Sequence, residues 1–159
     1  MAPIDTVSEF LALDVLTLRA HTLSAGDEFN EERHRLSLMT SLQVSQICMV
    51  RRNDALVAYA TLKPESATCW FVTGFNTHPL YRTAAVMREL FSSLAVVFKC
   101  YGITELRSHV YRTNNLSTSF HKRLGFRITR ESDKAVEFFI NVAELNVRLT
   151  GLEANRIPR

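Results

Sequence analysis

Residues 114–126, NNLSTSFHKRLGF, mark the element from which the rest of this chain can be placed. The side chain of Asn114 or Asn115 can accept hydrogen bonds from N–H groups that the first turn of a helix leaves unpaired. The apolar positions recur at every fourth residue and so share one face: Leu116, Phe120 and Leu124. Gly125 supplies the left-handed residue that commonly ends a helix, and Phe126 begins an alternating run. This pattern predicts a short, capped amphipathic helix that leads into a strand.

A long apolar helix is predicted upstream of this stretch, over about residues 85–100, with a strand on each side. Its apolar residues recur at every fourth position: Val86, Leu90, Leu94 and Phe98. The run ends at Gly102, and the flanking segments 68–75 and 103–110 are typical of strands. The order strand, helix, strand favours a parallel pair with a right-handed crossover. So much apolar surface must be buried that the helix is expected to lie across the sheet.

The first 21 residues are predicted to form a short helix and then a strand. Residues 6–9, TVSE, match a capping box, and the helix that follows would end near Leu13. Residues 16–21, LTLRAH, alternate apolar and polar positions as a half-buried strand does. This alternation puts His21 on the solvent side of the expected strand.

A second helix and a hairpin are predicted next. Asp27 is the expected N-cap of a helix over residues 28–42, and the buried stripe of that helix would contain three residues: Phe29, Leu36 and Met39. Two β-rich runs follow at 47–51 and 55–62. They are joined by Asn53-Asp54, which suits a tight hairpin turn.

The chain is expected to close with another hairpin, over residues 126–129 and 135–142. The sequence therefore predicts an α/β (α+β) fold, with a single domain over residues 1–145. Its central sheet would be mixed, mostly antiparallel, with about six to seven strands flanked by helices. Residues 146–159 are expected to form a C-terminal tail with at most one or two helical turns and a frayed end.

Composition excludes several classes of protein. With 47% hydrophobic and 22% charged residues, the chain as a whole is not disordered. No apolar run is long enough to span a membrane, and we expect no signal peptide. The three cysteines, Cys48, Cys69 and Cys100, lack metal-ligand spacing, so reduced thiols, no metal site and a cytoplasmic location are expected. A net charge of +3 suits an anionic ligand, but it is small for nucleic-acid binding.

Two motifs resemble the GNAT superfamily of N-acyltransferases. Residues 114–126 keep the family's asparagine, its small residue three positions later and the closing Leu-Gly-Phe. Residues 77–82, THPLYR, are similar to the family's junction between a strand and a loop, commonly V-H-P-x-Y-R-G. The two motifs occur in the family's order, and the predicted order of helices and strands is also similar. The resemblance implies a GNAT-like fold, acetyl-CoA as the cofactor and direct attack of a primary amine on the thioester.

The resemblance also implies where coenzyme A would bind. The family holds the pyrophosphate in a loop, Arg/Gln-x-x-Gly-x-Gly/Ala, which falls here on Arg82, Thr83, Ala84, Ala85, Val86 and Met87. Such a loop opens a helix whose free N–H groups favour phosphate. Ala85 and Met87 replace the family's glycines, and Met87 adds a side chain that could crowd the cofactor. The pantetheine would lie in a splay between strands, beside Asn76, Thr77 and His78, with Asn114 and Ser117 of the later motif close to it.

His121 is the candidate catalytic residue, because it stands where many family members have a tyrosine that resembles a general acid. A phenol with a pKa of about 10 is protonated at neutral pH, whereas an imidazole with a pKa of about 6.5 is mostly neutral. An acid role would need a carboxylate to raise the pKa of His121, whereas a neutral His121 could be a base. The structural alternative is a surface histidine beside Lys122 and Arg123. Glu65 and Glu105 could act as bases only in principle, so the sequence does not identify a catalytic base.

Two functions fit these observations. The first is an N-acetyltransferase that moves an acetyl group from acetyl-CoA to the amine of a small molecule or peptide. The second is a GNAT-fold protein without catalysis that acts as a binding or regulatory module, which Met87 and the lack of an evident base suggest. Neither a membrane nor a nucleic acid is expected as a partner, and a homodimer is left open.

Overall fold

The computed structural model describes residues 2–154 of the chain, with side chains from residue 6 to residue 151. A six-stranded sheet forms the centre of this part of the chain. Its order is β1-β2-β3-β4-β6-β5. The strands are β1 (Gln46–Arg52), β2 (Ala55–Pro64), β3 (Cys69–Thr77), β4 (Glu105–Tyr111), β5 (Arg127–Glu131) and β6 (Ala135–Asn141). The helices are α1 (Ala2–Ser24), α2 (Glu31–Val44), α3 (Ala84–Tyr101), α4 (Asn115–Arg123) and α5 (Val142–Ala154), with a 3-10 turn, η1 (Pro79–Tyr81). Within the described residues, none of these helices is long and apolar enough to cross a membrane.

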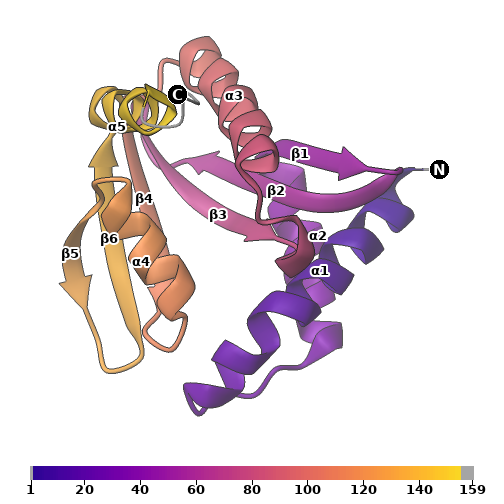
Figure 1. Cartoon of the computed structure of the whole chain (residues 1–159). Helices are drawn as coiled ribbons and strands as arrows, with labels where there is room; N and C mark the ends of the chain where they lie inside the picture. The colour runs from indigo at the N-terminus through magenta and orange to yellow at the C-terminus, as the bar shows by residue number, and fades with distance from the viewer. Residues whose placement is uncertain (1, 155–159) are drawn as a thin grey trace.

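The sheet confirms the predicted fold class, because one parallel pair lies among antiparallel ones. That pair is β3 with β4, and it extends only from Cys69 and Glu105 to Phe71 and Arg107. Beyond it, β3 stays paired with β2 alone, while β4 stays paired with β6. The two halves of the sheet therefore separate, and Figure 1 shows β3 and β4 diverging from their shared end.

Different helices cover the two faces of the sheet (Figure 1). α3 packs on one face through the predicted stripe, which is buried: Val86, Leu90, Leu94 and Phe98. α1 and α2 pack on the other face, where the rings of Phe10 and Tyr59 lie 4.3 Å apart between centroids. β2 contributes to both faces, because alternate residues of a strand point to opposite sides: Ala60 packs with α3, and Tyr59 packs with α1.

The prediction of a short helix followed by a strand before residue 24 is wrong, because α1 is one continuous helix of 23 residues. Residues 16–21 alternate in polarity, yet their burial follows the helical period. Thr17, Leu18 and His21 are partly buried, whereas Leu16 is 55% exposed. The buried face of α1 thus carries polar residues, which hid the helical period from an analysis that counts apolar positions.

The predicted buried stripe of the second helix is also wrong. Leu36 and Met39 are 56% and 43% exposed, and Leu38 is the buried residue of α2. The helix begins at Glu31, where Asn30 caps it by accepting a hydrogen bond from the N–H of Arg33. Asp27, the expected cap, instead accepts hydrogen bonds from side chains of other elements.

The C-terminal segment is longer in structure than predicted, because α5 continues through residue 154 for 13 residues. Val142 and Leu145 are buried in the same core as α3, and Leu149 packs against it. This packing stabilises more than the one or two helical turns expected. Residues 155–159, on which the expectation of a frayed end partly rests, lie outside the described part of the chain.

Leu94→Ala should lower the free energy of unfolding by about 2–5 kcal/mol, because it removes buried methyl groups and leaves a cavity under α3. Leu94 is 3% exposed, whereas Val96, two residues later, is 62% exposed. Val96→Ala is therefore the control, and its cost should stay within about 0.5 kcal/mol. Chemical denaturation measures both, and equal effects of the two substitutions would contradict the assigned core face.

Candidate functional site

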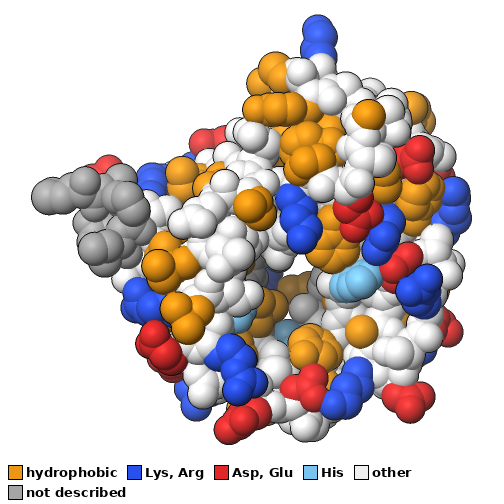
Figure 2. Space-filling model, turned by 180° about the vertical axis from the view of Figure 1, so that it is seen from behind, with side chains coloured by type: hydrophobic (Ala, Val, Ile, Leu, Met, Phe, Trp, Pro, Cys, Tyr) orange, Lys and Arg blue, Asp and Glu red, His pale blue; other side chains and the backbone are white. Residues whose placement is uncertain are grey.

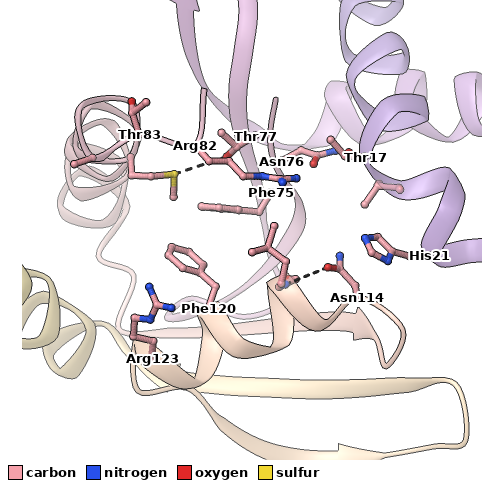
Figure 3. A pocket seen from close by; sticks show the side chains of 15 residues that line it. Thr17, His21, Phe75, Asn76, Thr77, Arg82, Thr83, Asn114, Phe120 and Arg123 are labelled. Atoms are coloured by element: carbon pink, nitrogen blue, oxygen red, sulfur yellow. Dashed lines mark hydrogen bonds between the residues drawn. The ribbon is translucent and has the colours of Figure 1, made fainter. Parts of the chain in front are cut away.

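We call the gap between the diverging ends of β3 and β4 the splay. A cavity of about 280 Å³ opens beside it and is lined by α1, the end of β3, the start of α3, and α4. We name it the arginine pocket, because Arg82 and Arg123 line it from two sides (Figure 3). The described residues that line it include no Asp or Glu. The pocket therefore offers two fixed positive charges without a competing carboxylate, which suits an anionic ligand.

Most of the residues predicted for the cofactor meet in the arginine pocket. The lining contains Asn76, Thr77, Arg82, Thr83, Ala84, Met87, Asn114 and Ser117. They come from three segments far apart in the sequence, and the splay brings these segments together. Figure 3 shows Asn76 and Thr77 of β3 on one side and Asn114 at the start of α4 on the other.

Three other predicted cofactor residues do not line this pocket. Val86 is 2% exposed and its side chain lies in the core. Ala85 is exposed beside it. His78 stabilises η1, because its Nδ1 accepts the N–H of Leu80 over 3.1 Å.

The start of α3 leaves few free N–H groups. The hydroxyl oxygen of Thr83 accepts the N–H of Val86 over 3.2 Å and caps the helix, so the N–H groups of Ala84 and Ala85 remain for a ligand. The sulfur of Met87 lies 3.7 Å from the hydroxyl of Thr77 at the end of β3. A thioether therefore lines the pocket at the position where the resembled family has a glycine.

α4 forms as predicted. Asn114 caps it by accepting the N–H of Ser117 over 3.1 Å, and Gly125 follows it with a φ of 96°. Leu116 was expected on the apolar face, but it is 53% exposed and lines the arginine pocket instead. Phe120 points toward Phe75 of β3, with 5.9 Å between ring centroids.

His121 is buried, with 8% of its surface exposed, so the alternative of a surface histidine is wrong. Its Nδ1 donates to the carbonyl oxygen of Ser117 over 2.7 Å, and its Nε2 lies 3.1 Å from the hydroxyl of Ser108. The ring stacks on Phe138 with 4.7 Å between centroids. Burial lowers the pKa of His121 below its ordinary value of 6.5, and the hydrogen bond to Ser117 only partly opposes this shift. The ring is therefore held neutral.

A second cavity of about 280 Å³ lies on the α1 and α2 side of the splay. We name it the histidine pocket, because four histidines line it: His21, His34, His109 and His121. Its described lining contains one carboxylate, Asp14, and no Lys or Arg. Phe75 and Ser117 line both cavities, so the two pockets meet at the splay.

Asp14 is a buried carboxylate at the histidine pocket, with only 1% of its surface exposed. Its Oδ1 accepts hydrogen bonds from the hydroxyl of Tyr59 and, over 2.8 Å, from the amide of Asn76. Its Oδ2 lies 2.7 Å from Nε2 of His34. Burial, together with the charge of Asp14, raises the pKa of Tyr59 well above its ordinary value of 10.0, so the phenol stays protonated.

The pairing of β2 with β3 places two of these partners, because Tyr59 and Asn76 are directly opposite each other. The ring of Tyr59 lies directly over Gly74, and its hydroxyl contacts Asp14. A Cβ at position 74 would lie 2.8 Å from the Tyr59 ring and 3.0 Å from the hydroxyl of Thr61. Only a residue without a side chain fits beneath Tyr59 at this point.

The sequence analysis missed Asp14 and His34 and placed His21 toward solvent. The available signal was the spacing of Asp14, Thr17 and His21, which fits one helix face at i, i+3 and i+7. These polar residues occupy the inward face of α1, so a search for apolar periodicity passed over them. Their position was recoverable only by treating the whole segment 2–24 as helical.

Hydrogen bonds join the end of α1 and the following loop to the far half of the sheet; we call them the clasp. The hydroxyl of Thr113 donates to the carbonyl oxygen of His21 over 2.7 Å, and Nδ1 of His21 donates to the carbonyl oxygen of Thr113 over 3.2 Å. Asp27 accepts from Lys134 and, over 2.8 Å, from Tyr111, and these two partners lower the pKa of its carboxyl group. The clasp closes the wide end of the splay.

Comparisons with solved structures find the same fold in other proteins. The PaiA N-acetyltransferase from Thermoplasma acidophilum, solved in complex with coenzyme A, superposes with a TM-score of 0.68 at 15% identity over 87% of this chain and 94% of its own. An acetyltransferase from Thermus thermophilus gives a TM-score of 0.67 at 18% identity over 89% and 93%. The ribosomal-protein-S18-alanine N-acetyltransferase from Escherichia coli gives 0.62 at 12% identity over 86% and 87%.

At these identities the superpositions show a shared fold. No curated protein sequence matches the chain. A sequence model of the acetyltransferase (GNAT) domain, however, matches residues 19–141, which is most of the chain and includes the β3, β4 and α4 segments that line the pockets. On this match, the chain belongs to the GNAT acetyltransferase family.

Proposed function

We propose that this protein transfers an acetyl group from acetyl-CoA to a primary amine. The observation that carries the proposal is the separation of charge between two pockets that meet at the splay. The arginine pocket holds two cations and no described carboxylate, whereas the histidine pocket holds one carboxylate and no described Lys or Arg. An anionic cofactor on one side and a cationic amine on the other match these two environments.

The residues of the arginine pocket fit coenzyme A. Arg82 and Arg123 can make charge-assisted hydrogen bonds to the pyrophosphate, and the N–H groups of Ala84 and Ala85 lie at the positive end of the α3 dipole. Asn76 and Thr77, at the end of β3, are placed to line the pantetheine arm. The coenzyme A complex of the PaiA N-acetyltransferase, which has the same fold, supports this assignment.

Acetyl-CoA supplies a thioester, whose carbonyl carbon the amine attacks as the carbon–sulfur bond breaks and coenzyme A leaves as a thiol. The protein's part is to hold the two reactants in line where the pockets meet, beside Phe75 and Ser117. The rings of Phe75 and Phe120, with 5.9 Å between their centroids, give this point an apolar wall.

We propose that His121 takes part in the chemical step as a neutral group. An acid role requires a second proton on the ring, which burial disfavours. The neutral ring accepts the hydroxyl of Ser108 at Nε2 and donates at Nδ1 to Ser117, whose hydroxyl lies 3.3 Å from Nδ1. His121 would thereby orient the hydroxyl of Ser108 within the histidine pocket.

The acceptor is proposed to be the amine of a small molecule or peptide, and the site of action to be the cytoplasm. The cytoplasmic proposal is supported by the cysteines, because Cys48, Cys69 and Cys100 are all unpaired thiols.

Arg82→Gln should weaken acetyl-CoA binding, because it removes a charge-assisted hydrogen bond worth about 1.5–3 kcal/mol. Thermal unfolding with and without acetyl-CoA measures the effect, since a ligand at a hundredfold excess over Kd stabilises the folded state by about 2.7 kcal/mol. Arg130→Gln on exposed β5 makes the same charge change away from the pocket and should bind normally. Equal binding by both variants would remove Arg82 from the site.

Met87→Gly should bind acetyl-CoA more tightly than the wild type while unfolding at a lower temperature. The substitution removes a side chain that lines the pocket but costs up to about 1 kcal/mol of helix propensity. Met87→Ala separates the two effects, because it removes most of the bulk and keeps the propensity. Binding by the glycine variant but not by the wild type would favour an inactive relative, and binding by neither would contradict the proposed function.

His121→Gln should remove part of the pH dependence of stability. Because burial holds the pKa of native His121 below 6.5, the unfolded chain binds a proton below pH 6.5 that the native protein resists. The wild type should therefore lose stability relative to the variant as the pH falls through and below 6.5. Urea denaturation across this range measures the difference, and a constant difference would mean that native His121 titrates normally.

A further inference from the structure

The histidine pocket contains a buried carboxylate and a histidine to which the proposed chemistry has so far given no role. Oδ2 of Asp14 lies 2.7 Å from Nε2 of His34. The Asp14 side chain is 2% exposed, whereas that of His34 is 28% exposed. The carboxylate thus lies at the bottom of the pocket, and the imidazole connects it with the solvent side. Figure 2 shows the hollow from behind, with histidine atoms inside it.

The surroundings of Asp14 fix which nitrogen of His34 carries a proton. A carboxylate only accepts hydrogen bonds, so Nε2 of His34 must donate to it. In the neutral ring, the lone pair is then on Nδ1, and no described side chain forms a hydrogen bond with Nδ1. Tyr59 and Asn76 occupy the other oxygen of Asp14 and hold the carboxylate still. An imidazole oriented by a buried carboxylate, with its second nitrogen free, is a common arrangement for a base.

We infer that His34 is the base that takes a proton from the acceptor amine, and that Asp14 is the residue that positions it. This inference rests on the proposed acetyl transfer. The location supports it, because Asn76 bonds Asp14 and also lines the arginine pocket, so one residue joins the base to the cofactor side. His34 and His121 both line the histidine pocket, one from α2 and one from α4.

The protons balance in this scheme. The acceptor arrives as an ammonium ion and gives one proton to Nδ1 of His34, which becomes an imidazolium paired with Asp14. The freed lone pair of nitrogen forms the bond to the acetyl carbon while the carbon–sulfur bond breaks. The second proton of the nitrogen passes to the sulfur, so the products are the N-acetyl amine and the coenzyme A thiol. Partly exposed His34 then returns its proton to water.

The pocket also indicates the class of acceptor. Its one carboxylate and its lack of Lys or Arg among the described lining favour a cation, and its volume of about 280 Å³ suits a small molecule. The acceptor is therefore a small primary amine. A metal site is not a competing explanation, because the described residues contain no group of three His, Cys, Asp or Glu side chains that could hold an ion.

The deciding variant is His34→Gln. Glutamine can still donate to Asp14 through its amide, so the tie between α1 and α2 is kept while the basic ring nitrogen is lost. Arg33→Gln is the control, because Arg33 precedes His34 on α2, is exposed and lines neither pocket. Acetyl-CoA binding is measured first by thermal shift. Thiol release is then measured with n-butylamine, phenethylamine and the peptide amide of four alanines.

The inference predicts that His34→Gln binds acetyl-CoA like the wild type but loses about a hundredfold or more in kcat for the best amine, with KM little changed. Arg33→Gln should keep kcat within about twofold. Added imidazole should restore part of the activity of His34→Ala, which a purely structural role would not allow. Asp14→Asn should also lower kcat, and imidazole should not rescue it.

Three results would overturn the inference. The first is a His34→Gln enzyme with kcat within about threefold of the wild type. The second is a loss confined to KM, which would assign His34 to binding. The third is a wild-type protein that binds acetyl-CoA yet acetylates none of the small amines. A wild-type protein that fails to bind acetyl-CoA would instead contradict the proposed function itself, and the two failures are thereby distinguished.

Discussion

The early end of the pairing between β3 and β4 is the constraint on which the rest of the structure depends. The two strands share only three paired positions, ending at Phe71 and Arg107, although β3 continues for six further residues to Thr77 and β4 continues to Tyr111. Beyond this point the backbone groups that face the gap lack a strand partner, and such groups need other hydrogen-bonding partners. The gap also lets side chains from α1, β3 and α4 approach one another, which creates both pockets at their meeting point.

The central part of the fold could be predicted from the local sequence, because each pattern there is compatible with only one type of element. The stripe from Val86 to Phe98 is apolar at every fourth position, and it is buried as expected. Asn53 and Asp54 both adopt positive φ values, as a tight hairpin turn requires. The predictions for the two ends of the chain were wrong for different reasons. α1 turns polar residues inward toward the site, whereas α5 gains stability from tertiary packing that weak local signals do not reveal.

The same division applies to the site. That eight of the residues predicted for the cofactor would meet could be anticipated, because they belong to contiguous motifs that the fold brings to one pocket, whereas their role in binding stays a prediction. The opposite side could not, because Asp14, His34 and Tyr59 come from three elements that are distant in sequence and meet only through folding. None of them is unusual in its own segment. Tyr59 looks like an ordinary strand residue, and its contact with Asp14 further requires the missing side chain at Gly74.

The clasp connects the two halves of the sheet at the end where β3 and β4 lie apart. β3 and β4 are joined at one end by their short ladder, and α1 spans the other end through His21 and Thr113, so the opening is a closed triangle. Widening this opening would require breaking the hydrogen bonds between His21 and Thr113. The distance between the diverging ends of β3 and β4 is therefore coupled to the position of α1, a helix that lies outside the sheet.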